Sequence, residues 1–235
     1  MIRYKLINDS NMNVNILGKA QAIFADYVYE NLDFSWIDKW WPVLDDGGVF
    51  IAMTDFHSIF ELGMKLKSMP NSKLVCHLAW KNEFGNFPKD RFHQCFDDIV
   101  IFSKGNHNHF YSERVQIPKV TLTKGLNPSG RETKTATAFI SDICLTTTAL
   151  ERVKYDDGHL VRWQKPKALI QRILDPFTDK NDLVLDLFMG TGVVGKWALE
   201  NDRSYIGIEN DNVIFNLAKL GILYTVVNLD IPEML

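Results

Sequence analysis

The chain has 235 residues, of which 46% are hydrophobic and 23% charged, a balance typical of globular proteins. Its length suits one α/β domain with an insertion, and no apolar run approaches the ~18 residues of a membrane span. The first residues lack the apolar core of a signal peptide, and the three cysteines form neither a zinc pattern nor a disulfide framework. We therefore expect a cytoplasmic protein with free thiols, no membrane association and no metal site.

Charge is distributed unevenly along the chain. The formal net charge is −3, which alone argues against a nucleic-acid partner. Between Lys104 and Lys167, however, eleven lysines and arginines stand against six acids, so a basic middle segment interrupts an acidic body. Such a segment suits a groove that follows phosphates, and it equally suits a solvated loop.

The first hundred residues alternate strand-like and helical patterns. Strands are predicted at the apolar runs Tyr4–Ile7, Ala22–Ala25, Val49–Met53, Leu74–Trp80 and Asp98–Phe102. Two helices, the first shortened or kinked by a proline, are predicted at Ile37–Leu44 and Phe56–Met69, with a turn at Asp45–Gly48.

Two polar stretches follow predicted strands in this half. Asp26-Tyr27-Val28-Tyr29 comes directly after the run Ala22–Ala25. Trp80 ends another strand and opens an aromatic loop that reaches Arg91-Phe92 before the next strand. By themselves these stretches are also compatible with ordinary strand ends and core or surface aromatics.

Residues 105–161 show no sustained periodicity and are rich in Thr, Lys, Asn and Gly. A segment of about 50 residues without structure of its own is uncommon in a compact domain unless it has a function. His107 and His109 have no further ligands at a spacing that would hold a metal ion.

The last third carries the clearest pattern. Gln164-Lys165-Pro166 opens an amphipathic helix, and the apolar run Val184–Phe188 is interrupted by Asp186. Gly190 and Gly192 flank Thr191 before a helical pattern begins at Val193. Strand, glycine turn and helix form the unit that cradles nucleotides in doubly wound sheets. A second strand, Ser204–Ile208, ends in Glu209, followed by a helix at Asp211–Leu223 and an edge strand at Tyr224–Val227.

A Lys-Pro helix, an Asp-x-Phe-x-Gly-x-Gly turn and a strand that ends in Glu resemble the cofactor half of the S-adenosylmethionine-dependent DNA amino-methyltransferases of the permuted β class. The resemblance implies an α/β, Rossmann-like methyltransferase fold, with a mostly parallel doubly wound sheet and an inserted target-recognition segment. It implies a catalytic half at residues 1–104, the recognition segment at 105–161 and the cofactor-binding half at 162–235. The cofactor would be S-adenosyl-L-methionine and the partner double-stranded DNA, with a homodimer as one option.

The resemblance also assigns roles to residues. Cofactor contacts fall on Asp9, Lys165, Pro166, Asp186, Phe188, Gly190, Thr191, Gly192 and Glu209, with Asp9 at the adenine and Glu209 at the ribose. The catalytic motif falls on Asp26 and Tyr29, and the base pocket on Tyr27, Trp80 and Phe92. DNA contacts are expected at Arg114, Lys119, Lys124, Arg131 and Lys134.

The chemistry explains why these residue types matter. An exocyclic amine is a poor nucleophile because its lone pair is delocalised into the base. A carboxylate such as Asp26 and a backbone carbonyl such as that of Tyr27 can accept its two hydrogens and localise that lone pair. Tyr29 can stack on the flipped base.

The motif at Asp26 departs from the family pattern Asp-Pro-Pro-Tyr, because both prolines are absent. Their loss removes stiffness rather than a functional group. An aspartate at position 26 favours adenine-N6 over cytosine-N4 as the target. A catalytically impaired DNA-binding subunit is the alternative, whereas the spacing of Gly190, Gly192 and Gly195 argues against a dinucleotide oxidoreductase.

Overall fold

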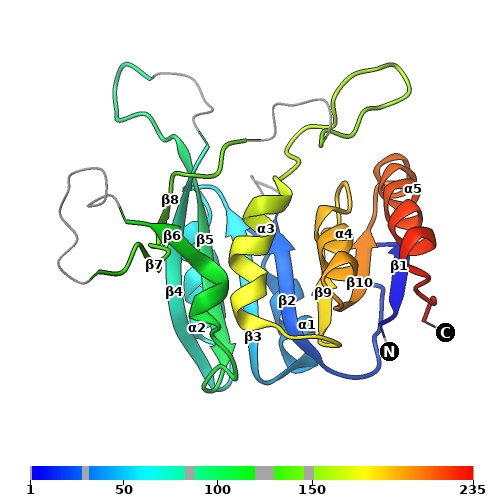
Figure 1. Cartoon of the computed structure of the whole chain (residues 1–235), viewed down its shortest axis with the longest axis horizontal. Coiled ribbons are helices and arrows are strands. Elements are labelled where there is room, and N and C mark those ends of the chain that lie inside the picture. Colours follow the sequence, from blue (N-terminus) through cyan, green and yellow to red (C-terminus); the bar gives the residue numbers. More distant parts are fainter. Residues whose placement is uncertain (1, 28–31, 83–87, 120–129, 146–150, 235) are drawn as a thin grey trace.

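The computed structural model describes residues 2–27, 32–82, 88–119, 130–145 and 151–234. Within them an eight-stranded sheet has the order β1-β10-β9-β2-β3-β5-β4-β8 (Figure 1). Its strands are β1 Tyr4–Asn8, β2 Ala20–Asp26, β3 Leu44–Thr54, β4 Ser72–Lys81, β5 Phe96–Lys104, β8 Phe139–Ile140, β9 Leu183–Asp186 and β10 Ser204–Glu209. The first five strands in this order are parallel, β5 is antiparallel to both its neighbours, and β8 is parallel to β4.

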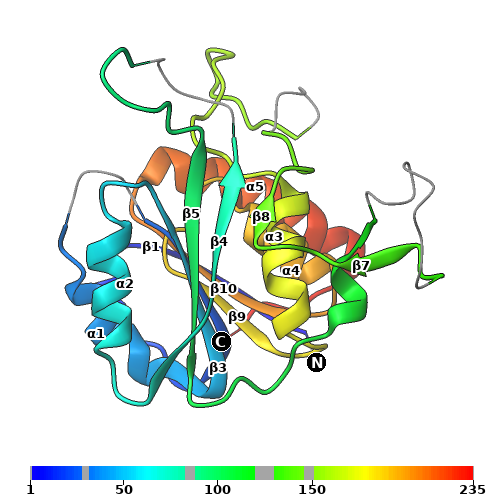
Figure 2. The ribbon, with the colours of Figure 1, turned by 90° about the vertical axis from the view of Figure 1, so that its left-hand side faces the viewer.

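Helices cover both faces of the sheet, as Figures 1 and 2 show. One face carries α1 Ser35–Trp40, the 3-10 turn η1 Trp41–Val43 and α2 Ile59–Lys67. The other face carries α3 Lys167–Leu174, the turn η4 Asp175–Phe177, α4 Val193–Glu200 and α5 Asn212–Leu229. Each face buries its own apolar cluster against the sheet, so the strands are apolar on both sides, as a doubly wound sheet requires. The predicted α/β fold is therefore confirmed.

The strand order reverses between β2 and β9. From β2 the chain moves to β3 on one side, and from β9 it moves through α4 to β10 on the other. Because the strands on both sides of this point are parallel, Asp26, Asp186 and Glu209 all lie at the carboxyl edge of the sheet. Ligands of open α/β sheets bind at this switch point, so the crevice beside Asp26 and Glu209 is the expected ligand site.

The middle segment is partly integrated into this domain. It contains η2 Ser112–Val115 and a two-stranded ribbon of β6 Gln116–Pro118 and β7 Thr133–Thr135. It also supplies β8, which extends the main sheet at its β4 edge. The boundaries 1–104, 105–161 and 162–235 remain a prediction, but the middle segment shares the main sheet.

Two local predictions are wrong. The expected turn at Asp45–Gly48 lies inside β3, where a register shift opposite Ala20–Ala22 absorbs the extra residues as a bulge. The expected edge strand at Tyr224–Val227 is the last part of α5, because the β-branched residues there continue a helix that packs on α4 and β1. Tertiary packing overrides strand propensity in this case.

Helix α5 also corrects the statement about apolar runs. It is 18 residues long and apolar enough, by length and composition alone, to cross a membrane, and 28% of it is buried inside the protein. This is weak evidence for a span, since core helices of globular proteins meet the same criterion. Val213, Leu220, Tyr224 and Val227 are exposed along it. The homodimer and the absence of membrane association stay predictions.

Candidate cofactor and catalytic site

A cavity of about 180 Å³ opens at the carboxyl edge of β1, β9 and β10. The predicted cofactor residues Asp9, Phe188 and Glu209 line it together, with Tyr27 among the neighbouring residues. They come from three parallel strands and the turn after β9, so the fold brings together residues that are distant in sequence. Asn11, which sequence reasoning missed, also lines this cavity, and its side-chain amide donates to the Leu187 carbonyl at 3.4 Å.

The two glycines of the turn, Gly190 and Gly192, are needed there for different physical reasons. Gly190 has φ +53°, and a Cβ there would meet its nearest atom, the Phe188 carbonyl oxygen, only at 4.0 Å, so the space beside it is open to a ligand. Gly192 has φ +76° and forms the N-cap of α4. A Cβ on Gly192 would come within 2.9 Å of Ile222, so this glycine serves the packing of α4 on α5 rather than ligand approach.

Glu209 holds the glycine turn in place. One carboxylate oxygen accepts the Gly190 N–H at 2.8 Å and the other accepts the Asp211 N–H at 2.9 Å. Each oxygen keeps a second lone pair, so the carboxylate can still accept a vicinal diol. The cavity therefore fits S-adenosyl-L-methionine chemically: carboxylates for hydroxyl donors, the Phe188 ring for a base and an open backbone at Gly190.

Asp186 lies beneath this turn and is completely buried. Burial raises the pKa of its carboxyl to about 8, and the charges of Asp26 and Glu209 add to the shift. The Tyr205 hydroxyl, which donates to it at 3.1 Å, and the Phe188 N–H oppose that shift. Asp186 is therefore mostly protonated at physiological pH and acts on the turn through hydrogen bonds.

Tyr27 replaces the first missing proline in an unexpected way. Its N–H donates to the Met53 carbonyl at 3.0 Å, which continues the β2–β3 ladder by one residue. Its ring is buried at 5.3–5.6 Å from the rings of Phe34, Trp36 and Phe188. A proline could make neither contact, so this chain stiffens the segment after Asp26 by other means. Tyr27 lines the same cavity as Asp9, Phe188 and Glu209, and its assignment to a base pocket stays a prediction.

Lys165 is the unexpected member of the catalytic edge. Its ammonium nitrogen lies 2.9 Å from Oδ2 of Asp26 and 3.9 Å from Oδ2 of Asp97, and its side chain is only 5% exposed. Pro166 is the N-cap of α3 and turns this lysine back over the end of β2. The sequence motif predicted a cofactor contact for Lys165, whereas the structure pairs its ammonium with the carboxylate of Asp26.

Two residues predicted for the base pocket lie elsewhere. Trp80 is completely buried, and its indole N–H donates to the Ile143 carbonyl at 2.9 Å, so it belongs to the core between β4 and the middle segment. Phe92 is 98% exposed on the loop after β4, so in this conformation it encloses no pocket. The catalytic candidate Tyr29 lies outside the described residues.

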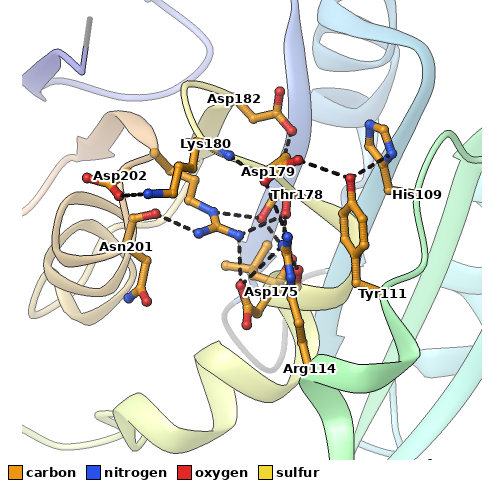
Figure 3. A network of polar contacts seen from close by, with 12 residues as sticks. His109, Tyr111, Arg114, Asp175, Thr178, Asp179, Lys180, Asp182, Asn201 and Asp202 are labelled. Carbon is orange, nitrogen blue, oxygen red and sulfur yellow. Dashed lines mark hydrogen bonds and ion pairs between the residues drawn. The ribbon is translucent and has the colours of Figure 1, made fainter.

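Arg114 is held in a structural network (Figure 3). Its guanidinium donates to the Thr178 carbonyl at 2.8 Å, pairs with Asp179 at 3.3 Å and lies over the Tyr111 ring. Asp179 precedes β9, so this network lies at the amino edge of the sheet, opposite the crevice. Arg114 is therefore no candidate for contact with DNA bound at the crevice. Its role is to attach the middle segment to the end of α3.

The other predicted DNA contacts lie on or next to the ribbon of β6 and β7. Arg131 and Lys134 are exposed there, whereas Lys119, directly after β6, is half-buried. Lys124 lies outside the described residues. Among the residues that the structure describes, no group of three or more His, Cys, Asp or Glu side chains is arranged to hold a metal ion.

Two Arg-aromatic pairs extend from the carboxyl edge: sequence reasoning noted Arg91-Phe92 and placed Phe92 in a base pocket, but it missed Arg162 and Trp163. Arg91 and Phe92 on the loop after β4, and Arg162 and Trp163 just before α3, are exposed on two loops that extend from this edge (Figure 1). Trp163 has φ +65°, which is unusual for a bulky residue and marks a strained position. The signal in the sequence was the repeated Arg-aromatic pair.

An open, mostly parallel sheet with a glycine turn and a strand-ending glutamate at its switch point defines the class of doubly wound α/β proteins that bind nucleotide-containing cofactors. Within that class, the chain belongs to the DNA methylase family N6_N4_Mtase, whose pattern matches residues 18–220. The resemblance to DNA amino-methyltransferases is thereby confirmed.

Individual relatives agree with this assignment. The chain is 26% identical over 200 residues to the type II methyltransferase M.HinfI of Haemophilus influenzae. This alignment covers 83% of this chain and 52% of that protein. It is 28% identical over 193 residues to the type II methyltransferase M2.MboI of Moraxella bovis, which covers 80% of this chain and 64% of that protein. The chain thus spans between about half and two thirds of the length of these relatives.

Solved structures share the fold. The complex of M1.HpyAVI with SAM has a TM-score of 0.65 at 19% identity and covers 93% of this chain and 99% of that one. TTHA0409 of Thermus thermophilus, complexed with S-adenosyl-L-methionine, has a TM-score of 0.63 at 16% identity, with coverages of 96% and 95%. The cytosine-N4-specific PvuII DNA methyltransferase has a TM-score of 0.65 at 12% identity, with coverages of 98% and 94%.

Proposed function

We propose that this protein transfers a methyl group from S-adenosyl-L-methionine to the exocyclic N6 amine of adenine within a specific sequence of double-stranded DNA. The observation that carries the proposal is the position of Asp26. In a chain of the DNA methylase family, this carboxylate lies at the end of β2, directly beside the switch point and the glycine turn.

The cofactor is assigned to the cavity after β1, β9 and β10. Glu209 would accept the ribose hydroxyls, Asp9 would face the adenine, and the backbone at Gly190 would pass the methionine part. When bound, the cofactor supplies an electrophilic methyl group on a sulfonium. The protein then has to hold the target amine in line with that methyl group.

Asp26 and the carbonyl of Tyr27 are the groups that would accept hydrogen bonds from the amine. The bound cofactor would supply its methyl group to the amine nitrogen and leave as the neutral thioether, and the nitrogen would then release one proton to solvent. Acceptors held beside that nitrogen would stabilise its developing positive charge. Asp26 ends β2, which is buried in the sheet, and the hydrogen bond from Tyr27 to Met53 holds the following backbone in place without the prolines.

DNA would approach the carboxyl edge between the two exposed loops. Arg91 and Arg162 can neutralise phosphates, and the adjacent rings of Phe92 and Trp163 can stack on bases. The ribbon that bears Lys119, Arg131 and Lys134 extends the positive charge away from this edge. These contacts are part of the proposal and replace the one expected at Arg114.

The proposal is tested by expressing the chain in cells that lack DNA methylation, digesting their DNA to nucleosides and measuring these by mass spectrometry. N6-methyladenine is expected with the parent and absent with Asp26→Ala, while calorimetry shows the same affinity for S-adenosyl-L-methionine in both. Detection of N4-methylcytosine instead of N6-methyladenine would mean that the target base is cytosine rather than adenine. Neither product, with intact cofactor binding, would favour a non-catalytic DNA-binding subunit instead.

A further inference from the structure

The pairing of Lys165 with Asp26 raises a question that the proposed function does not answer. The ammonium nitrogen lies 2.9 Å from the carboxylate that the amine of the base would need. An ammonium and an exocyclic amine are both N–H donors with the same preference for a carboxylate acceptor. In the absence of DNA, the lysine therefore takes the place of the substrate amine.

Keeping the lysine there would oppose methyl transfer. The base nitrogen gains positive charge as it is methylated, and a second cation at hydrogen-bond distance from the same carboxylate repels it. The side chain of Lys165 is only 5% exposed, so solvent screens this repulsion poorly. The lysine needs another acceptor when the base enters.

Asp97 is placed to be that acceptor. Its Oδ2 lies 3.9 Å from the ammonium nitrogen, 1.0 Å farther than Oδ2 of Asp26, so rotation of the lysine side chain alone can exchange the two partners. Oδ1 of Asp97 accepts the side-chain amide of Asn82 at 2.8 Å, which fixes the carboxylate toward the lysine.

Resting on the proposed function, we infer that Lys165 occupies Asp26 while the crevice is empty and transfers to Asp97 when the target base enters. Asp97 is then a positioning residue, since it acts on the reaction through the lysine. The exchange keeps the buried carboxylates compensated in both states, and it exposes Asp26 only to a base that can donate hydrogen bonds.

The exchange depends on pH because Asp97 must be ionised to receive the lysine. Burial raises the pKa of its carboxyl to about 6; the ammonium of Lys165 opposes the shift, and the charges of Asp26, Asp98 and Asp55 add to it. Asp26 lies on β2, Asp98 on β5, Asp55 directly after β3 and Lys165 just before α3. Below pH 6, a neutral Asp97 leaves the lysine on Asp26, and base capture should fall about tenfold per pH unit.

The test uses Asp97→Asn, which mimics the protonated state, with Asp98→Asn as the matched control. Asp98 is the next residue on β5, points to the opposite face and pairs with His77. At saturating cofactor and pH 7.5, Asp97→Asn should lower kcat/KM for DNA on the order of tenfold or more. It should also remove the decline below pH 6, whereas Asp98→Asn should keep a decline, with its midpoint moved to lower pH because the charge of Asp98 raises the pKa of Asp97.

The decisive variant combines Asp97→Asn with Lys165→Met. With no lysine to relocate, the double variant should recover activity relative to Asp97→Asn. It should also recover base flipping, which is measured by the fluorescence of 2-aminopurine at the target position. A double variant as impaired as Asp97→Asn, or more so, would overturn the inference, because Asp97 would then act independently of Lys165.

One readout requires no DNA and separates this inference from the proposed function. In a ¹³C NMR titration of the Asp97 carboxyl, Lys165→Met should raise the pKa, since the ammonium stabilises the ionised form. An unchanged titration would mean that the two groups do not interact, whatever the protein does to DNA. A raised pKa in a chain that methylates nothing would keep the lysine–Asp97 pair and refute the proposed function alone.

Discussion

Replacement of Asp186 by Asn tests the electrostatics of the carboxyl edge through folding stability. Burial raises the pKa of this carboxyl from 3.8 to about 8, despite the hydrogen bond that Tyr205 donates to it. The folded protein thus holds a proton, between about pH 4 and pH 8, that the unfolded chain has released. Because the folded state binds more protons in this window, its stability falls as the pH rises.

The magnitude follows from the pKa difference. One proton held only by the folded state gives a slope of about 1.4 kcal/mol per pH unit. Between pH 5 and pH 7, Asp186 alone should therefore lower the free energy of unfolding by roughly 2–3 kcal/mol. Asp186→Asn has a similar shape, can accept the Tyr205 hydroxyl and cannot ionise, so this contribution vanishes. Other titrating groups, Asp97 among them, are common to both proteins and cancel in the comparison.

The assay is urea denaturation of the parent and of Asp186→Asn at pH 5, 6 and 7, without cofactor. Relative to the parent, the variant should gain roughly 2–3 kcal/mol of unfolding free energy over this range. Tyr205→Phe is the complementary variant: it removes a donor that favours the ionised carboxyl, so its pH dependence should extend to higher pH. Equal slopes for the parent and Asp186→Asn would refute the reasoning, since they would mean that the buried carboxyl is ionised in the folded protein.

Three further predictions concern individual contacts. Tyr27→Pro, which restores part of the family motif, should destabilise the protein by about 3 kcal/mol or more because it removes a ladder hydrogen bond and a buried ring; thermal denaturation measures this, and a gain in stability would contradict it. Arg114→Met should lower stability by about 1–3 kcal/mol and leave the salt dependence of DNA binding unchanged; a smaller slope would return Arg114 to the DNA contacts. Arg162→Ala and Lys134→Ala should each lower the slope of log K against log salt by about one unit; an unchanged slope would exclude that residue from phosphate contact.

Local sequence patterns determined the elements that form the cofactor half. The apolar run up to Asp186, the glycine turn and the helix from Val193 are each encoded within a few residues, because periodicity and left-handed glycines act over short distances. The parallel direction of the strands then followed from the α/β alternation. Parallel strands end at one edge, and for this reason Asp26, Asp186 and Glu209 could be expected to lie near one another.

Only the tertiary structure decided which side chains meet at that edge. Lys165 reaches Asp26 across 139 positions of sequence, and Asp97 approaches the same lysine from a strand that no local pattern connects to it. Trp80 and Arg114 have residue types that suit a base pocket and a phosphate contact, yet strand order buries one and places the other at the opposite edge. Periodicity in the sequence shows which face of a helix or strand is apolar. Which side chains contact one another depends on how these elements are ordered in the sheet, and that order depends on packing summed over the whole chain.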